Sequence, residues 1–407
     1  MVKMKFKDSY TGYHSFDYLD SNLDFHKFDL APEVDRVASE RVQISRNEED
    51  TVEELCEKFT MVSMHDHPFV LPKDLKNVYE YIKRNHIYTG YSGLAMSGLS
   101  GVFDGLLNSF NLINSNAPWN WNSVISELGM KLCDIEHQNF AIKASRVADI
   151  YKAKKQKQIA IIPHLEGAGM IENDLDRIDI LYGLGIRCIG LVYSESNYLG
   201  SGFKERKDGG LTDFGYRAVE RFNKIGMTID LAHVGDETSI EAISASKKPC
   251  LITHAGCRSL WDTKRMKPDN VLTLLAEKGG VLGIEAAPHT TLSERHPKHS
   301  IYSVMDHFVK AVEIMGIDHV GFGPDTMFGD HVGMHHLFSR ELGINESLLA
   351  KKYEEVPFVN GLENPSEFVN IVRWLVKNGY SSSEIEKVTG KNVLRVLSET
   401  WAYGDIN

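Results

Sequence analysis

The sequence predicts an α/β protein folded as a (β/α)8 TIM barrel. Short apolar runs rich in Val, Ile and Leu alternate along the chain with longer segments of helical period. Apolar runs of this kind are typical of parallel strands that are buried on both faces. Eight such runs can be placed in order, and eight parallel strands with intervening helices close a barrel of this class.

The predicted strands and helices follow one another from residue 60 onward. The expected strands are 60–65, 100–107, 159–164, 188–193, 227–233, 250–254, 280–286 and 319–325. The clearest expected helices, in which apolar residues recur every three or four positions, are 174–185, 213–226, 237–247 and 268–280.

The chain divides into three predicted parts. Residues 1–45 are rich in Tyr, Phe, Asp and His without a clear period, so we expect an N-terminal arm or cap, with a partly ordered tail as the alternative. Residues 46–400 are expected to form the barrel, with a loop insertion at 326–362 and closing helices at 363–400. Residues 401–407 are expected to be a tail.

Charge and hydropathy exclude several classes of partner. The 407 residues carry a net charge of −11 and no long basic run, which argues against nucleic acid. No apolar stretch approaches the roughly 18 residues of a membrane span, and the N-terminus lacks the apolar segment of a signal peptide. Five cysteines without C-x-x-C spacing predict buried thiols. We therefore expect no membrane partner and a cytoplasmic location.

Side chains that can bind metal stand at the ends of the predicted strands. The first strand runs into VSMHDHP, where His65 and His67 are two positions apart and therefore on one side of a strand, before Pro68 stops it. Later strand ends supply Glu166, His233, His254 and Asp325. Because the carboxyl ends of barrel strands meet at one face, these side chains should converge.

This set of imidazoles and carboxylates predicts a centre of two metal ions. His65 and His67 would hold one ion, and a carboxylate from Glu166 could bridge to a second. His233 and His254 would hold that second ion. Such ligands suit Zn²⁺, with Mn²⁺ or Fe²⁺ as alternatives. A single histidine at a strand end is usually an ordinary polar residue, but five candidate ligands in this order are hard to explain as structure.

The same strand ends predict a hydrolytic reaction. Two ions about 3.5–4 Å apart would hold and acidify a bridging hydroxide. Asp325 can then accept its proton and pass it to the leaving group. His164, although it lies near Glu166 in the sequence, is left outside this site.

Beyond single residues, the chain resembles the membrane (renal) dipeptidase family, peptidase family M19, within the amidohydrolase superfamily. The resemblance spans about residues 55–400. Its carriers are HDHP, HLEGAGMIENDLDRIDILYGLGIRCIGLVYSESNYLGSG, GLTDFGYRAVERFNKIGMTIDLAHVGDET, ITHAGCRSLWDTKRMKPDNVLTLLAEKGGVLGIEAAP, HVGFGPD, GLENPSEF and VTGKNVLRVL. It implies a (β/α)8 zinc hydrolase that cleaves dipeptides.

Site roles follow from this resemblance by position. Glu166 matches the bridging glutamate, and Asp325 matches the aspartate that transfers a proton. His233 and His254 match the ligands of the second metal. Arg265 falls where the family places the arginine that binds a substrate carboxylate, with Arg258 and Lys264 as nearby alternatives. An arginine there would hold a carboxylate through a bidentate pair.

Two positions depart from the family pattern. The family has His-x-Asp on its first strand, whereas this chain has His65-x-His67. Exchanging a carboxylate for an imidazole makes the first metal about one charge unit more positive, which should acidify its water further. Where the family has a histidine that steadies the oxyanion, this chain has Tyr193, which can donate a hydrogen bond but carries no positive charge.

We therefore expect a binuclear metal-dependent hydrolase that cleaves the amide bond of a small, carboxylate-bearing substrate, a dipeptide or N-acyl amino acid. The alternative is the same centre acting on a lactone, another ester or a non-peptide amide, motivated by His67 and Tyr193. A binding protein without catalysis is disfavoured, because an inactive site needs neither Glu166 nor Asp325. We also expect a homo-oligomer.

Overall fold

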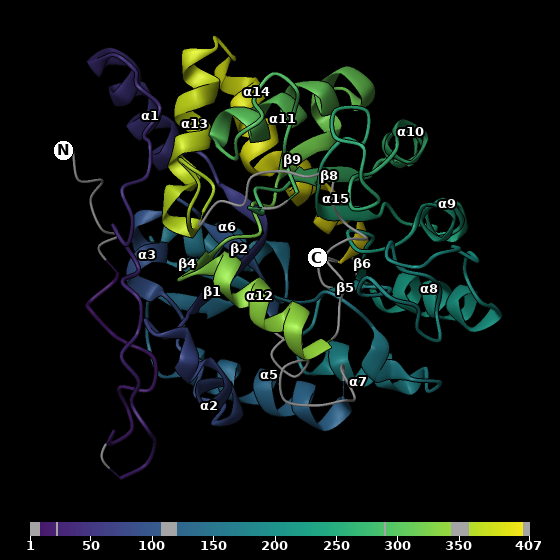
Figure 1. Ribbon diagram of the computed structural model, residues 1–407, viewed down its shortest axis with the longest axis horizontal. Helices are drawn as coiled ribbons and strands as arrows, with labels where there is room; N and C mark the ends of the chain where they lie inside the picture. Colours follow the sequence, from purple (N-terminus) through teal and green to yellow (C-terminus); the bar gives the residue numbers. More distant parts are fainter. Residues whose placement is uncertain (1–8, 22, 107–119, 289, 343–357, 402–407) are drawn as a thin grey trace.

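A curled parallel sheet surrounded by helices forms the body of the protein in the computed structural model (Figure 1). The structure describes residues 9–21, 23–106, 120–288, 290–342 and 358–401. The strands are β1 (Val62–Val70), β2 (Gly101–Leu106), β3 (Ala141–Lys143), β4 (Ile159–Leu165), β5 (Cys188–Gly190), β6 (Thr228–Asp230), β7 (Leu251–Ala255), β8 (Val281–Ile284), β9 (Val320–Phe322) and β10 (Met327–Phe328). Each of the eight predicted strands overlaps one of these.

The sheet closes on itself. Its strand order is β10-β1-β2-β4-β5-β6-β7-β8-β9, with every pairing parallel and the short β3 beside β4. Because β10 follows β9 in the chain and pairs with β1, the last strand returns to the first. The backbone N–H of Asp325 donates to His65 O at 3.0 Å, and that of His67 donates to Thr326 O at 2.8 Å. This closure confirms the predicted (β/α)8 barrel class.

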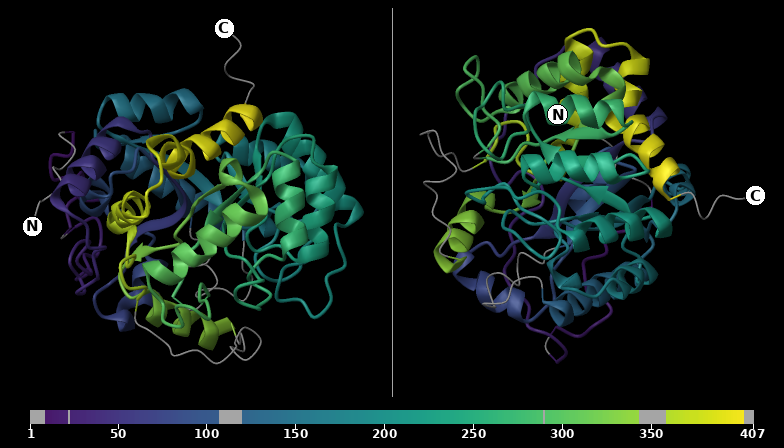
Figure 2. Two further views of the ribbon diagram at one scale, coloured as in Figure 1. Left: turned by 90° about the horizontal axis from the view of Figure 1, so that it is seen from above. Right: turned by 90° about the vertical axis from the view of Figure 1, so that its right-hand side faces the viewer.

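Helices cover the outside of the sheet (Figure 2). They are α1 (Arg46–Lys58), α2 (Val78–Lys83), α3 (Tyr91–Met96), α5 (Trp121–Glu136), α6 (Val147–Lys155), α7 (Asp176–Gly183), α8 (Asp213–Ile225), α9 (Asp236–Ala245), α10 (Asp269–Glu277), α11 (Ile301–Met315), α12 (His331–Leu342), α13 (Val369–Lys377), α14 (Ser382–Glu386) and α15 (Asn392–Thr400). The ends of α8 follow from local chemistry. Thr212 caps its first turn by accepting from Gly215 N, and Gly226 ends it in the left-handed conformation that glycine adopts without strain.

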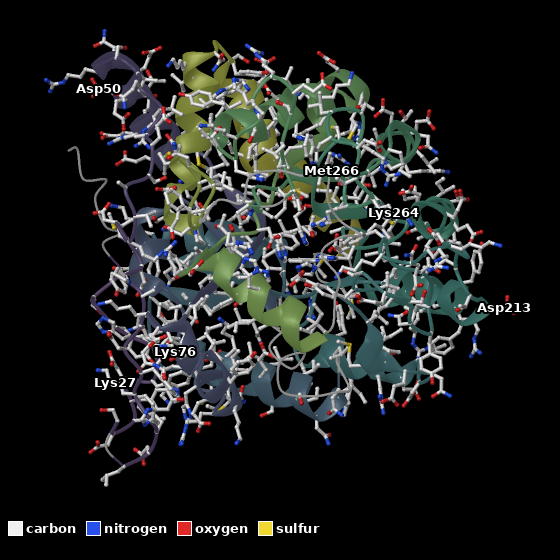
Figure 3. The ribbon with its side chains drawn as sticks, viewed as in Figure 1. Lys27, Asp50, Lys76, Asp213, Lys264 and Met266 are labelled. Atoms are coloured by element: carbon white, nitrogen blue, oxygen red, sulfur yellow. The ribbon has the colours of Figure 1, made fainter. Side chains whose placement is uncertain are left out.

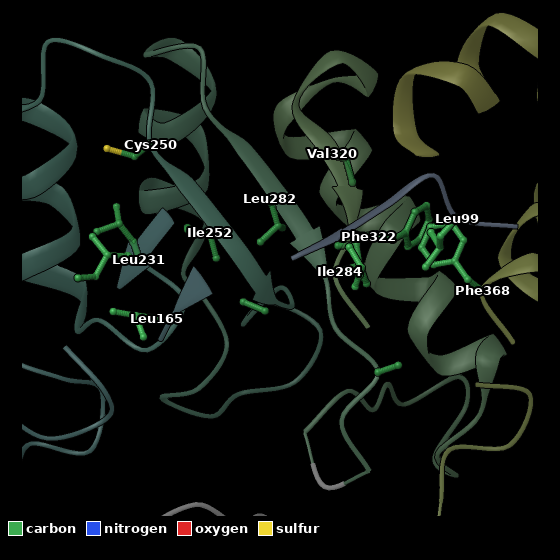
Figure 4. Packing of buried hydrophobic residues seen from close by; sticks show 14 of the residues in the cluster. Leu99, Leu165, Leu231, Cys250, Ile252, Leu282, Ile284, Val320, Phe322 and Phe368 are labelled. Atoms are coloured by element: carbon green, nitrogen blue, oxygen red, sulfur yellow. The ribbon is translucent and has the colours of Figure 1, made fainter. Parts of the chain in front are cut away.

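Apolar side chains fill the space between the sheet and these helices. Ile252, Leu282 and Phe322 from three adjacent strands belong to one large buried cluster (Figure 4). Phe222 of α8 and Phe308 of α11 belong to the same cluster, so the helices lie against the sheet through their apolar faces. A second cluster joins side chains of β1, β2, β4 and β7 to α15. A rigid barrel therefore supports the strand ends.

The described part of the N-terminal arm packs on its own barrel. Buried Asp134 of α5 accepts hydrogen bonds from Tyr13 Oη at 2.7 Å, Ser15 Oγ at 2.7 Å and Phe16 N at 2.9 Å. Phe16 itself is buried. The division between arm and barrel at residue 45 stays a prediction.

The predicted loop insertion contains regular structure. It includes β10 and α12, and α12 crosses in front of the strands in Figure 1, whereas residues 343–357 lie outside the described part. Trp401, predicted as tail, is buried and donates from Nε1 to Thr228 Oγ1 at 2.9 Å. Among the described residues no helix is both long and apolar enough to cross a membrane.

Candidate metal centre

The side chains predicted at strand ends converge at the carboxyl end of the barrel. His65 and His67 lie on β1, and His254 lies on β7. Glu166 directly follows β4, and His233 follows β6 by three residues. The structure brings their ligand atoms into overlapping groups within 4.8 Å, which are His65–His67–Glu166, Glu166–His233–His254 and His65–His254–Asp325. All of the predicted metal ligands are thus in one cluster.

The strand that carries the first pair does not stop at Pro68. β1 continues to Val70, and its pairing with β10 shifts register between His67 and Val70. Proline has no N–H to donate to a neighbouring strand. A strand can therefore include a proline where its hydrogen-bond pairing is irregular. The expectation that Pro68 ends this strand was therefore wrong.

The first half of the centre is formed by His65, His67 and one oxygen of Glu166. His65 Nε2 lies 3.3 Å from His67 Nε2. His67 Nε2 lies 3.5 Å from Glu166 Oε1. The two imidazole rings are nearly perpendicular, with an interplanar angle of 88°.

The second half uses the other oxygen of the same glutamate. Glu166 Oε2 lies 3.2 Å from His233 Nε2 and 3.7 Å from His254 Nε2. The two histidine Nε2 atoms are 3.0 Å apart. Glu166 therefore presents Oε1 to His67 and Oε2 to His233, with Oε2 also 3.9 Å from His65 Nε2, and a bridging carboxylate needs its two oxygens divided in this way.

These spacings fit bound metal ions. Two ligands of a tetrahedral zinc, each about 2.0–2.1 Å from the ion, lie about 3.3–3.4 Å apart. His67 Nδ1 is 2.9 Å from the carbonyl oxygen of Gly105, which can only accept, so Nδ1 carries a proton and Nε2 is the nitrogen that faces the other ligand atoms. His233 Nδ1 is held by Ser194 Oγ at 3.1 Å. Nitrogen atoms that face other ligand atoms at this distance can share a bound cation with them.

Burial and charge set the protonation of these groups. Burial lowers the pKa of His67, but the carboxylates of Glu166 and Asp325 outweigh it and raise that pKa to about 9. Burial raises the pKa of Glu166, yet the surrounding histidines lower it to about 2. Burial, with the positive charge of Arg265, lowers the pKa of His233 to about 4. The bridging carboxylate is therefore ionised, and His233 is neutral, as metal ligands must be.

Asp325 sits beside the first half in a strained backbone conformation. Its φ is +58°, in the left-handed region that costs a non-glycine residue roughly 1–2 kcal/mol. Its Oδ1 lies 3.2 Å from His67 Nε2 and 3.4 Å from His65 Nε2. The turn thus directs a carboxylate, more exposed than the ligands, to the open side of the cluster.

The chain matches one known protein family over most of its length. Residues 49–355 and 334–405 match the family described as membrane dipeptidase, peptidase family M19. The chain belongs to this peptidase family. That membership confirms the resemblance that its motifs predicted.

Curated relatives of this M19 member include named dipeptidases. Dipeptidase tcpJ of Claviceps purpurea is 29% identical over 266 residues, which is 65% of this chain and 56% of the relative. Dipeptidase verJ of Clonostachys rogersoniana is 28% identical over 252 residues, 61% of this chain and 58% of the relative. The alignments thus span somewhat more than half of each relative's length.

Solved structures of similar fold cover most of this M19 chain. An amidohydrolase from Pseudomonas aeruginosa superposes with a TM-score of 0.70 at 24% identity, covering 86% of this chain and 99% of that one. A metallo peptidase from Rhodobacter sphaeroides, liganded with a phosphinate mimic of the dipeptide L-Ala-D-Ala, gives a TM-score of 0.66 at 18% identity, covering 84% and 99%. At these identities the similarity concerns the fold.

Arg265, the predicted carboxylate clamp, is already paired in this M19 member. Its position in the chain lies between Lys264 and Met266, which Figure 3 labels. Arg265 Nη2 lies 2.5 Å from Oε2 of Glu285, and both side chains are buried. Its Nη1 donates to Ala232 O at 3.2 Å. Reading the sequence missed Glu285, because nothing local marks an acid after β8 as the partner of an arginine 20 positions earlier.

The two alternatives to Arg265 are bound elsewhere. Arg258 forms a bidentate pair with Asp236, at 2.5 and 2.9 Å. Lys264 Nζ donates to Glu205 O at 2.8 Å. Of the three cations considered, Arg265 is the one whose charge lowers the pKa of His233 and His254, so it is the one that faces the centre.

Tyr193 and His164 also contact the ligand histidines. The ring of Tyr193 stacks on His233 with centroids 4.3 Å apart. Burial, with the charges of Glu166 and Asp325, raises the pKa of Tyr193 well above its usual value, so its phenol stays protonated and can donate. His164, left outside the predicted ligand set, is not among the clustered donors but lies 3.2 Å from His65, Nδ1 to Nδ1.

Proposed function

We propose that this chain is a binuclear metal-dependent hydrolase that cleaves the amide bond of a small, carboxylate-bearing substrate, a dipeptide or an N-acyl amino acid. The convergence of four histidine Nε2 atoms on the two oxygens of Glu166 carries this proposal. Membership of a peptidase family supports it. The names of the curated relatives, which are called dipeptidases, point the same way.

The ligands divide between two ions. His65 and His67 would hold one, His233 and His254 the other, and Glu166 would be shared. Nitrogen and carboxylate donors favour Zn²⁺, with Mn²⁺ or Fe²⁺ as alternatives. Bound ions would polarise the scissile carbonyl and bring the pKa of water near neutrality.

Three further side chains have roles around the reacting bond. Asp325, beside the first pair of histidines and more exposed than they are, accepts a proton from the attacking water and returns it to the leaving amine. Tyr193 donates a hydrogen bond to the carbonyl oxygen as it gains negative charge. Arg265 holds the substrate carboxylate, in competition with Glu285.

A second candidate function rests on the Arg265–Glu285 pair. A guanidinium already neutralised by a buried carboxylate attracts a substrate carboxylate less strongly. This favours an ester, a lactone or an amide that lacks a free carboxylate next to the cleaved bond. Tyr193, which carries no positive charge, is compatible with either class of substrate.

Metal analysis combined with a substrate panel tests these proposals. We expect about two metal ions per chain after purification without chelator, and loss of metal in Glu166→Ala. We expect turnover on dipeptides or N-acyl amino acids, and turnover on lactones or esters alone would favour the second candidate. Metal without turnover on any of these would support a binding protein. A reproducible value near zero, unrestored by added Zn²⁺, Mn²⁺ or Fe²⁺, would refute the binuclear proposal.

Location and assembly are further parts of the proposal. We propose a cytoplasmic homo-oligomer with a small-molecule substrate and without nucleic-acid or membrane partners. The acidic net charge of −11 supports the absence of nucleic acid. Cell fractionation and sedimentation of the purified chain test location and assembly separately.

A further inference from the structure

We infer that one buried carboxylate, Asp230, positions two metal-ligand histidines, one in each half of the centre, through His164 and Thr253. His65 is reached through His164, and His254 through Thr253. The inference rests on the proposed function, because it concerns the ligands of the two proposed ions. It makes His164, Thr253 and Asp230 positioning residues that touch no substrate.

Asp230 is the last residue of β6 and is 1% exposed. Its Oδ1 accepts from the backbone N–H of Thr253 at 2.8 Å and of Ala232 at 3.1 Å. Its Oδ2 accepts from Thr253 Oγ1 at 2.8 Å and lies 3.2 Å from His164 Nε2. An ionised carboxylate only accepts hydrogen bonds, so these contacts fix where the protons of its neighbours lie.

The connection from Asp230 through His164 leads to the first half of the centre. Asp230 can only accept, so the His164 tautomer that suits this contact has its proton on Nε2 and leaves Nδ1 as an acceptor. That nitrogen lies 3.2 Å from His65 Nδ1, so His65 donates to it. His65 Nε2 is then left bare and faces His67 and Glu166.

The connection from Asp230 through Thr253 leads to the second half of the centre. The single hydroxyl proton of Thr253 goes to Asp230, so Thr253 Oγ1 is an acceptor toward His254 Nδ1, which is 2.8 Å away. His254 therefore holds its proton on Nδ1. Its Nε2 is left bare and faces His233. The rings of His65 and His254 stack with centroids 3.7 Å apart, so the two connections from Asp230 end on adjacent imidazoles.

The other two ligand histidines are anchored independently of Asp230. His67 uses the carbonyl of Gly105, and His233 uses the hydroxyl of Ser194. Each half of the centre thus contains one histidine held locally and one held through Asp230. A carboxylate that orients a ligand imidazole through its second nitrogen keeps the ligating tautomer and the ring direction.

Zinc retention by single and double variants tests the inference without an activity assay. Zinc content is measured over a series of free-zinc concentrations set by a chelator, on wild type, His164→Leu, Thr253→Val and the double variant. We expect each single variant to lose affinity at one of two sites by about 10–100-fold, the usual cost of removing such a partner. The double variant and Asp230→Asn should weaken both sites.

Two controls separate positioning from packing. In His164→Gln the amide can accept from His65 and donate to Asp230, so zinc affinity should recover relative to His164→Leu. Thr228 lies on the same strand as Asp230, and Thr228→Val loses buried hydrogen bonds to Trp401 and Thr400. These bonds are not part of the connections through His164 or Thr253. Thr228→Val should keep wild-type zinc affinity even where the melting temperature of the metal-free protein falls.

Several results would overturn the inference. One is unchanged zinc affinity at both sites in the single variants, and another is a loss of zinc affinity at the same site in both single variants. A third is zinc affinity in His164→Gln that is no higher than in His164→Leu. If His164→Leu fails to fold, the zinc affinities of Thr253→Val and Thr253→Ser are compared instead. Thr253→Ser keeps the hydroxyl, so it should retain the affinity that Thr253→Val loses. Fewer than two zinc ions in wild type would instead count against the proposed function.

Discussion

The two sides of the site are built in different ways. On the metal side, His65, His67 and His254 stand on strands, and Glu166 directly follows one. On the substrate side, Tyr193 and Arg265 stand in the segments that follow β5 and β7, and the charge of Arg265 is balanced within the chain. The proposed metal ligands are therefore placed mostly by strands, whereas the residues proposed to select the substrate lie in connecting segments.

The largest expected effect concerns Asp325. Asp325→Asn keeps the shape of the side chain and removes the proton acceptor, so kcat should fall by about 10²–10⁴-fold while metal is retained. Steady-state kinetics with metal analysis of the same samples measure this. Near-normal turnover on a confirmed substrate would remove Asp325 from the reaction.

A smaller effect is expected on the substrate side, at Arg265. Arg265→Met removes the charge at similar length and should cost roughly 1.5–3 kcal/mol in kcat/KM for a substrate with a free carboxylate. Substrates with that carboxylate amidated should react more slowly with wild type and lose little more in the variant. Equal losses for both substrates would make Arg265 a structural residue.

The same pair of substrates tests Glu285, the ion-pair partner of Arg265. Glu285→Gln keeps the size of the side chain and frees the guanidinium, so it should raise the preference for the carboxylate substrate over the amidated one. The ratio of the two kcat/KM values measures this. An unchanged ratio would mean that the Arg265–Glu285 pair does not tune substrate choice.

Tyr193 should show a weaker effect than either. Tyr193→Phe keeps a ring against His233 and removes one hydrogen-bond donor, so kcat should fall by roughly 2- to 10-fold, the value of a net hydrogen bond of about 0.5–1.5 kcal/mol. KM should change little, because the bond forms as charge develops. A change confined to KM would place the hydroxyl in ground-state binding instead.

The smallest expected effect is a proton count on the metal side. The metal-free centre holds a protonated His67 up to its pKa of about 9, whereas Glu166 and His233, with pKa values of about 2 and 4, are already deprotonated. A raised pKa means that this proton stabilises the metal-free protein fully below about pH 6.5 and stops doing so as pH rises through 9. Metal binding near pH 7.5 should therefore release about one proton per chain from His67.

Calorimetric titration of zinc in buffers of different ionisation enthalpy measures that release. The count should fall toward zero as pH rises above 9, and apparent zinc affinity should rise with pH up to that point. In His67→Gln the release near pH 7.5 should fall by about one proton. An equal count in wild type and variant would show that His67 is neutral before metal binds.

The sequence by itself determined the barrel class and the order of the candidate metal-binding side chains. Buried parallel strands are continuous apolar runs, so their positions can be found without any partner. A barrel brings the carboxyl ends of its strands to one face, so a His-x-His pair, a Glu and single histidines at those ends had to meet. The first-strand pair itself follows from the two-residue period of a strand.

Only the tertiary structure decided how these residues are held and what they face. Asp230 meets His164 across 66 positions of sequence, and Glu285 meets Arg265 from a different strand end. The helix at 331–342 and the extension of β1 past Pro68 likewise depend on neighbouring segments rather than on local pattern. Hydrogen bonds and ion pairs between distant segments depend on side-chain direction after the barrel has closed, and a linear pattern of residue types does not specify that direction.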